Sequence, residues 1–156
     1  MELAVEGVVG EGVRVVEIEA VDAHDLRRRV LREDRPAADV SFAEDHMAGA
    51  LHLGVRDDDG ALLAVASFSP GTAPHRPGAR AVRLRGLAVE PTLQQAGVGR
   101  MLLGTAIERL RSQGYEVLWA NGRDTVLGFY RRLGWQVVGQ GFVMAGHPHH
   151  VVTLEL

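Results

Sequence analysis

The chain contains no cysteine, so it has no disulfide bonds, no thiolate metal ligands and no cysteine nucleophile. It has no lysine either, and all 17 of its basic residues are arginines. No uninterrupted apolar run reaches the length that a membrane-spanning helix needs. Residues 1–12 mix glutamate with valine and glycine and lack a positively charged start, which is unlike a secretory signal. We therefore expect a cytoplasmic protein without a membrane partner.

Length and charge limit the chain further. Its 156 residues are 46% hydrophobic, which is enough for one domain with a buried core. The net charge is -3, and the arginines are scattered among acidic residues, so the sequence lacks the basic surface that nucleic-acid binding requires. We predict a single domain over 1–156, in which 1–12 form a flexible or additional N-terminal segment.

The spacing of apolar residues predicts the element order β-α-β-β-β-α-β-α-β-β. Asp22 is expected to cap the first helix, and Asp57 to Gly60 has the composition of a hairpin turn. This order predicts an α/β fold with a mixed central sheet of about six to seven strands, flanked by three to four helices. Strands are expected at 13–18, 50–56, 61–68, 81–89, 115–120, 135–144 and 150–156, and helices at 22–33, 98–113 and 124–133.

The segment from Arg85 to Arg100 carries the most informative motif. A strand that ends at Pro91 leads into a glycine-containing turn, and the turn opens a helix. Backbone N–H groups at such a junction have no partner within the helix, and the helix dipole adds partial positive charge, so the junction suits a pyrophosphate. Gly97 and Gly99 remove the Cβ atoms that would keep phosphate oxygens away. The Lys-Ser/Thr ending of a P-loop is missing, and the turn follows a hairpin rather than the first strand of a Rossmann unit.

A second motif follows a helix and a strand later. Asn121-Gly122-Arg123 follows a predicted strand, and Phe129-Tyr130 and Gly134-Trp135 lie on and after the next helix. Together with Gln94-x-x-Gly97-x-Gly99, this pattern resembles the GCN5-related N-acetyltransferases (GNAT). The resemblance covers residues 81–135 well, and the N-terminal half matches in element order alone. It implies the acyl-CoA N-acyltransferase fold and transfer of an acetyl group from acetyl-CoA to an amine.

The resemblance also implies roles for individual residues. Leu87 and Val89 would lend backbone groups to the pantetheine arm, and Asn121 would hydrogen-bond the cofactor or the incoming amine. Tyr130 would protonate the departing CoA thiolate, and a backbone N–H near Val89 would stabilise the oxyanion. The expected cofactor-binding set is Leu87, Ala88, Val89, Gln94, Gln95, Ala96, Gly97, Val98, Gly99, Arg100, Asn121, Phe129 and Tyr130.

The general base is less determined by the sequence. Candidates are His149, His150, His52 and Glu44, and we favour His149 because the segment from Gly146 to His150 resembles the Pro-His ending of some bacterial members. A metal site would need His147 and His149 to turn toward the same ion, and we expect no metal.

Three residues are assigned to the acceptor site, namely Glu44, His52 and Arg85. Arg85 would pair with an acidic acceptor or with Glu44, or would simply face solvent. Arg27 to Arg29 and Arg32 are expected to form a solvated basic face of the first helix. The acceptor itself stays open between a small-molecule amine and a peptide amine. Open alternatives are a longer acyl-CoA donor, an alcohol acceptor, and an acyl-CoA-binding module without turnover. Homodimers are common in the family, but no sequence feature specifies an interface.

Overall fold

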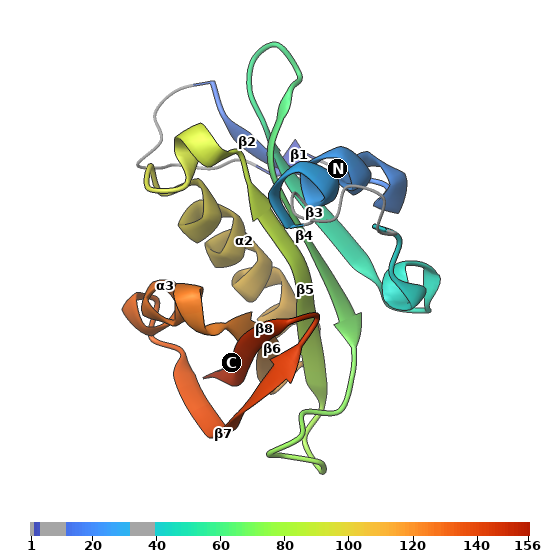
Figure 1. Cartoon of the computed structure of the whole chain (residues 1–156). Coiled ribbons are helices and arrows are strands. Elements are labelled where there is room, and N and C mark those ends of the chain that lie inside the picture. Colours follow the sequence, from blue (N-terminus) through green and yellow to red (C-terminus); the bar gives the residue numbers. More distant parts are fainter. Residues whose placement is uncertain (1, 4–11, 32–39) are drawn as a thin grey trace.

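The computed structural model describes residues 2–3, 12–31 and 40–156, which form one eight-stranded sheet in the order β1-β2-β3-β4-β5-β6-β8-β7 (Figure 1). All neighbouring strands are antiparallel except β5 and β6, which are parallel. The strands are β1 Glu2–Leu3, β2 Arg14–Glu17, β3 Leu51–Arg56, β4 Leu62–Pro70, β5 Ala81–Val89, β6 Val117–Arg123, β7 Gln136–Met144 and β8 His147–Glu155. The longer helices are α2 Val98–Ser112 and α3 Leu127–Arg132.

The seven predicted strands occur in the predicted order, and the eighth, β1, is a two-residue addition within 1–12. Most strand boundaries differ from the prediction by one or two residues, and two differ by three. β6 continues to Arg123 and β8 begins at His147, because these two segments pair with each other, with Arg123 opposite His149. Asparagine, glycine, proline and histidine are weak strand signals, so the sequence pattern did not reveal this pairing.

The first helical segment starts earlier than predicted. It consists of a 3-10 turn, η1 Ala20–Ala23, the short helix α1 His24–Leu26 and a π turn, η2 Arg27–Leu31. Glu19, not Asp22, occupies the N-cap, and the Asp22 carboxylate instead accepts a hydrogen bond of 3.0 Å from the Glu19 N–H. The predicted end at residue 33 lies outside the described residues. Within the described ranges, no helix is long and apolar enough to cross a membrane.

Two apolar layers cover the two faces of the sheet. α2 packs on the face of β3, β4 and β5 that carries Leu53, Ala66 and Leu84. The first helical segment lies on the opposite face (Figure 1), where Ala23 and Leu26 pack against residues of β2 and β4. This alternation follows from the two-residue period of strands, and it gives the sheet an α2 face and an α1 face, the names used below.

A buried ion pair joins the first helical segment to the loop before β3. Arg27 is 1% exposed, which corrects the prediction of a solvated basic face at this position. Its guanidinium donates to both Asp45 carboxylate oxygens at 2.8 and 2.9 Å, to the Val40 carbonyl at 2.8 Å and to the Ser67 hydroxyl at 2.8 Å. Burial disfavours the Asp45 carboxylate, but hydrogen bonds from Arg27 and from the Phe42 N–H outweigh it and lower the pKa of Asp45.

Replacing one member of this pair leaves the other charge buried without its counter-charge. We therefore expect Arg27→Met to reduce the free energy of unfolding by about 3–5 kcal/mol in urea denaturation. Arg29→Met is the matched control, because Arg29 is exposed and its ion pairs lie at the surface, so its loss should cost less than about 1 kcal/mol. Similar losses in both variants would contradict the importance of the buried pair.

Candidate functional site

β5 and β6 separate along their length. They share three residue pairs, from Ala81–Val117 to Arg83–Trp119, among the described residues. Beyond Arg83, β5 continues to Val89 beside β4, while β6 continues to Arg123 beside β8. The edge of β5 from residue 84 to 89 thus faces an opening in the sheet rather than a strand. An unpaired strand edge can take an extended molecule by backbone hydrogen bonding, as an added strand does.

A bulge in β5 sets which side chains line this opening. Val65 pairs with Ala88 and Ser67 with Arg85, so Gly86 and Leu87 together oppose one residue of β4. Gly86 has a φ of 69°, a conformation that glycine adopts without strain. The bulge shifts the alternation by one residue. Leu84 before it and Leu87 after it therefore both face the α2 side.

The N-terminus of α2 lies at the far end of β5. Gly97 precedes the helix with a φ of 88°, no described side chain caps the helix, and no acidic residue occurs in its first turn. The Gln94 side chain turns back and donates to the Val89 carbonyl at 3.2 Å, which fixes the turn to the strand end. The positive end of a 15-residue helix is thus left without a negative charge, which fits the predicted pyrophosphate site.

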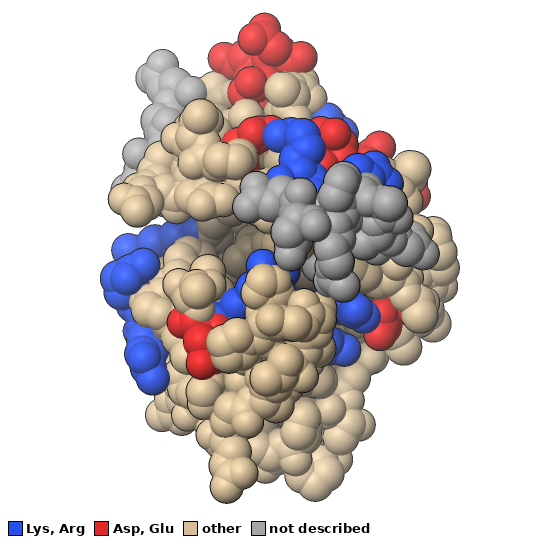
Figure 2. Space-filling model, in the orientation of Figure 1, with Lys and Arg blue, Asp and Glu red and all other residues tan. Residues whose placement is uncertain are grey.

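The two sequence motifs meet in space. A Cβ on Gly99 would lie 3.4 Å from both the Phe129 ring and the Val89 side chain. The Phe129 and Tyr130 rings are in edge contact at 5.3 Å, and a Cβ on Gly122 would lie 3.3 Å from the Tyr130 ring. One line of contacts therefore joins the start of α2 to α3 and the end of β6. Figure 2 shows a hollow on this face of the molecule, between the segment before α2 and α3, with arginine atoms at its edge.

Tyr130 lies on the α2 face, packed between Phe129 and Trp135, with 6% of its surface exposed. Its hydroxyl has no hydrogen-bond partner among the described residues. Burial raises the pKa of Tyr130 above its ordinary value, because the phenolate would lose its hydration. The side chain consequently keeps its proton at neutral and moderately alkaline pH, as a general acid must.

His149 and Asn121 belong to the α1 face. Gly122, next to Asn121, lies against the Tyr130 ring, and Val152 of β8 belongs to the core on the α2 face, so the alternation of β6 and β8 points Asn121 and His149 to the α1 face. The buried His149 ring stacks on Phe142 at 5.8 Å between centroids. Its Nδ1 donates to the His147 carbonyl at 2.7 Å, which leaves Nε2 of the neutral ring with a lone pair. No described residue hydrogen-bonds that nitrogen.

The other candidate bases already have partners. The buried His52 ring donates from Nε2 to the Asp45 carbonyl at 2.9 Å and accepts at Nδ1 from the Ser67 hydroxyl at 2.7 Å. Glu44 pairs with Arg85 at 2.9 Å, which is one of the pairings that the sequence suggested. His150 hydrogen-bonds Asp124 at 2.7 Å. Among the described residues, His149 and His150 each keep an Nε2 atom without a hydrogen bond, and of these two histidines His149 is the one on the α1 face.

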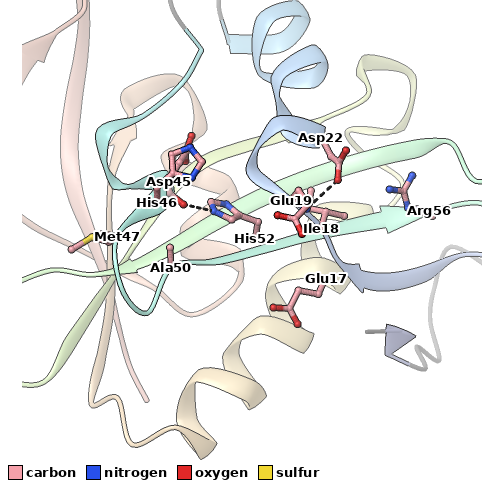
Figure 3. Close-up of a pocket in the computed structure, with 10 residues that line it drawn as sticks. All are labelled: Glu17, Ile18, Glu19, Asp22, Asp45, His46, Met47, Ala50, His52 and Arg56. Atoms are coloured by element: carbon pink, nitrogen blue, oxygen red, sulfur yellow. Dashed lines mark hydrogen bonds between the residues drawn. The ribbon is translucent and has the colours of Figure 1, made fainter.

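A pocket of about 490 Å³ opens on the α1 face, beside β2 and β3 (Figure 3). Figure 3 shows the His52 ring turned toward the Asp45 backbone, so two of the polar groups of the pocket satisfy each other. β4 separates β3 from the opening beside β5. No group of three or more His, Asp or Glu side chains placed to hold a metal ion occurs in the described part of the chain. The lining residues are Glu17, Ile18, Glu19, Asp22, Asp45, His46, Met47, Ala50, His52 and Arg56.

The sequence reasoning missed three contributors to this region. Gly86 was named within a motif without its bulge, Arg27 was expected in solvent, and Arg83 was not singled out. A signal existed for Arg83, since Arg83 and Arg85 alternate with Val82 and Leu84 along a strand that is otherwise apolar. Such a pattern places two charges on one face of a central strand.

Comparisons with known proteins agree with this geometry. The model of the acetyltransferase (GNAT) family matches residues 17–135. A Bacillus subtilis (strain 168) protein named uncharacterized N-acetyltransferase YitI is 36% identical over 143 residues, which cover 92% of this chain and 94% of that protein. An acyl-CoA N-acyltransferase from Pseudomonas aeruginosa has a TM-score of 0.72 at 17% identity, with 90% of this chain and 98% of that chain covered. Escherichia coli ElaA has a TM-score of 0.73 at 16% identity with the same coverage, and these two structures support the fold alone.

The turn before α2 offers a direct test of its geometry. Gly97→Ala places a Cβ on a residue with a φ of 88°, so we expect a loss of about 1–2 kcal/mol of unfolding free energy and weaker CoA binding in calorimetry. Gly104→Ala, in the same helix and with open space at the Cβ position, is the control and should stabilise the protein by about 0.5–1 kcal/mol. If Gly97→Ala binds CoA as tightly as the parent protein does, this turn is not the phosphate site.

Proposed function

The chain belongs to the GNAT family of acetyltransferases, and on this premise we propose that it transfers the acetyl group of acetyl-CoA directly to a primary amine. The observation that carries the proposal is the opening between β5 and β6, which both motifs line. The acceptor is a small-molecule amine or a peptide amine.

Different residues of the opening bind different parts of acetyl-CoA. The edge of β5 from residue 84 to 89 pairs with the pantetheine arm through backbone groups, with Leu87 and Val89 beneath it on the α2 face. The turn from Gln94 to Arg100 receives the pyrophosphate at the N-terminus of α2, and the exposed Arg100 adds a charged hydrogen bond. Phe129 packs against the arm from α3.

Chemistry then takes place across the sheet. The amine approaches from the α1 face, where His149 Nε2 removes its proton, directly or through water. The amine nitrogen bonds to the thioester carbonyl carbon, and backbone N–H groups of β5 near Val89 stabilise the oxyanion. The carbon–sulfur bond breaks, and Tyr130 on the α2 face donates its proton to the departing thiolate. Since base and acid occupy opposite faces, the attacking and leaving groups do not compete for one space.

Two alternative functions can be distinguished from acetyl transfer by measurement. A binding module without turnover needs the α2 turn but has no use for a buried phenol with a raised pKa. A transferase for longer acyl chains would bind a longer acyl-CoA more tightly than acetyl-CoA. Calorimetric titration with acetyl-CoA, CoA and a longer acyl-CoA, followed by thiol release with a panel of amines, distinguishes these cases.

Tyr130→Phe keeps the ring and removes the proton donor. We expect acetyl-CoA affinity in calorimetry to stay within about threefold of the parent protein, while thiol release with an amine falls on the order of a hundredfold or more. Tyr115→Phe is the control, because this phenol lies two residues before β6, next to Arg80, away from the opening. Full turnover by Tyr130→Phe would exclude this residue as a required acid. If the folded parent protein does not bind acetyl-CoA, the cofactor assignment is wrong.

His149→Gln tests the base. We expect kcat/KM for an amine to fall on the order of a hundredfold at neutral pH and to recover as the pH approaches the pKa of the free amine, because the acceptor then arrives deprotonated. His150→Gln is the companion variant, since His150 pairs with Asp124 on the α2 face. If kcat/KM falls in His150→Gln and not in His149→Gln, His150 is the general base instead.

A further inference from the structure

Arg83 and Arg85 stand two residues apart on β5 and share the α1 face of the sheet. The two arginines alternate along the strand with Val82 and Leu84, which belong to the core on the α2 face. The Arg83 guanidinium carbon lies 5.2 Å from the centre of the Trp119 ring, and that of Arg85 lies 4.2 Å from the centre of the Phe42 ring. Aromatic rings thus hold both cations against the sheet.

The two arginines differ in their partners. Arg85 forms an ion pair of 2.9 Å with Glu44. Arg83 has no hydrogen bond or ion pair within the part of the chain that the structure describes, and its Nε is buried without a partner. Partial burial of the guanidinium, together with repulsion from Arg85, lowers the pKa of Arg83, while Glu44 acts in the opposite direction. Arg83, Arg85 and Glu44 together therefore leave one positive charge uncompensated.

Such a charge is unfavourable in the protein alone. Arg83 is half-buried, and taking part of a cation out of water costs free energy unless a counter-charge or hydrogen-bond acceptors replace the water. Arg83 presents a planar fork of N–H donors, the geometry that matches a carboxylate. A carboxylate from outside the chain would supply both the charge and the acceptors that the described residues do not.

Arg83 also lies at the start of the opening. Arg83–Trp119 is the last residue pair of β5 with β6, and the bulge at Gly86 is three residues, or about 10 Å, further along the strand. Buried Ser69 pairs with Arg83 on the neighbouring strand, and a narrow crevice lined by Ser69, Glu44 and Arg85 adjoins it. An arginine side chain and a small acceptor together span this distance.

We propose that the acceptor amine carries a carboxylate, as amino acids do, and that Arg83 binds this carboxylate on the α1 face while the amine reaches the opening between β5 and β6. This inference rests on the proposed function and specifies its substrate class. Arg83 serves as a specificity residue, and Arg85, held by Glu44, adds long-range attraction without being the primary contact.

The experiment compares amines that differ in the carboxylate alone, such as an amino acid, its amide and the corresponding decarboxylated amine, with acetyl-CoA as donor. We expect kcat/KM to favour the amino acid over the other two by about tenfold to a hundredfold. Arg83→Met should abolish this preference through KM, with little change for the amide. Arg80→Met is the matched control, since Arg80 is exposed and contacts Tyr115 instead. Equal use of all three amines, or an unchanged preference in Arg83→Met, would overturn the inference while leaving acetyl transfer intact.

A binding measurement separates this inference from a failure of turnover. N-acetylglycine, added to the protein with CoA, should change tryptophan fluorescence saturably in the parent protein, and the change should disappear in Arg83→Met and in Trp119→Phe. Arg83→Met should also be at least as stable as the parent in urea, because it removes an unpaired cation. A large loss of stability would assign Arg83 a structural partner and contradict the proposal. Binding of N-acetylglycine without acetylation of any amine would refute the transferase function but support the carboxylate site.

Discussion

A side chain at residue 86 would occupy space that Phe42 and Arg27 already fill, since a Cβ there would lie 2.8 Å from the Phe42 ring and 3.1 Å from the Arg27 Nε. The glycine permits the positive φ of the bulge and the close approach of both groups at once. The bulge turns Leu87 and Val89 toward the α2 face, where the cofactor motif begins, and leaves Arg85 on the α1 face. The two faces of the proposed site therefore depend on one residue without a side chain.

Phe42 and Arg27 connect this bulge to the rest of the α1 face. The Phe42 ring lies between the guanidinium groups of Arg27 and Arg85, at 4.0 and 4.2 Å. Arg27 in turn holds Asp45 and Ser67, and Ser67 holds His52. The loop before β3 is thus anchored to the sheet by buried polar contacts rather than by apolar packing alone. Because hydrogen bonds are directional, this arrangement fixes Glu44, and through it Arg85, more closely than a hydrophobic contact would.

The sequence predicted the sheet and the two motifs because both are encoded locally. The alternation along β5 and the glycines at the start of α2, Gly97 and Gly99, are local features of the sequence, and the structure confirms the strand and the helix. The hydrogen-bond partners of Arg27 lie 13, 18 and 40 residues away in the sequence, and no local sequence pattern predicts them. Similarly, β6 extends through Asn121 and β8 includes His149 because these two strands pair with each other, although they are distant in the sequence. The assignment of Tyr130 and His149 to opposite faces required the register of both strands, which the sequence does not contain.

The separation of β5 from β6 divides the sheet into two unequal parts. β1 to β5 carry α2 and its N-terminal turn, whereas β6, β8 and β7 carry α3, and three residue pairs join the two parts along their shared edge. The groups proposed to hold the pyrophosphate thus belong to one part, and Tyr130, Asn121 and His149 belong to the other. A molecule that fills the gap contacts both and acts as a non-covalent cross-link between them. The co-substrate would then complete the sheet as well as react in it, so the enzyme would be most rigid when it is loaded for the reaction.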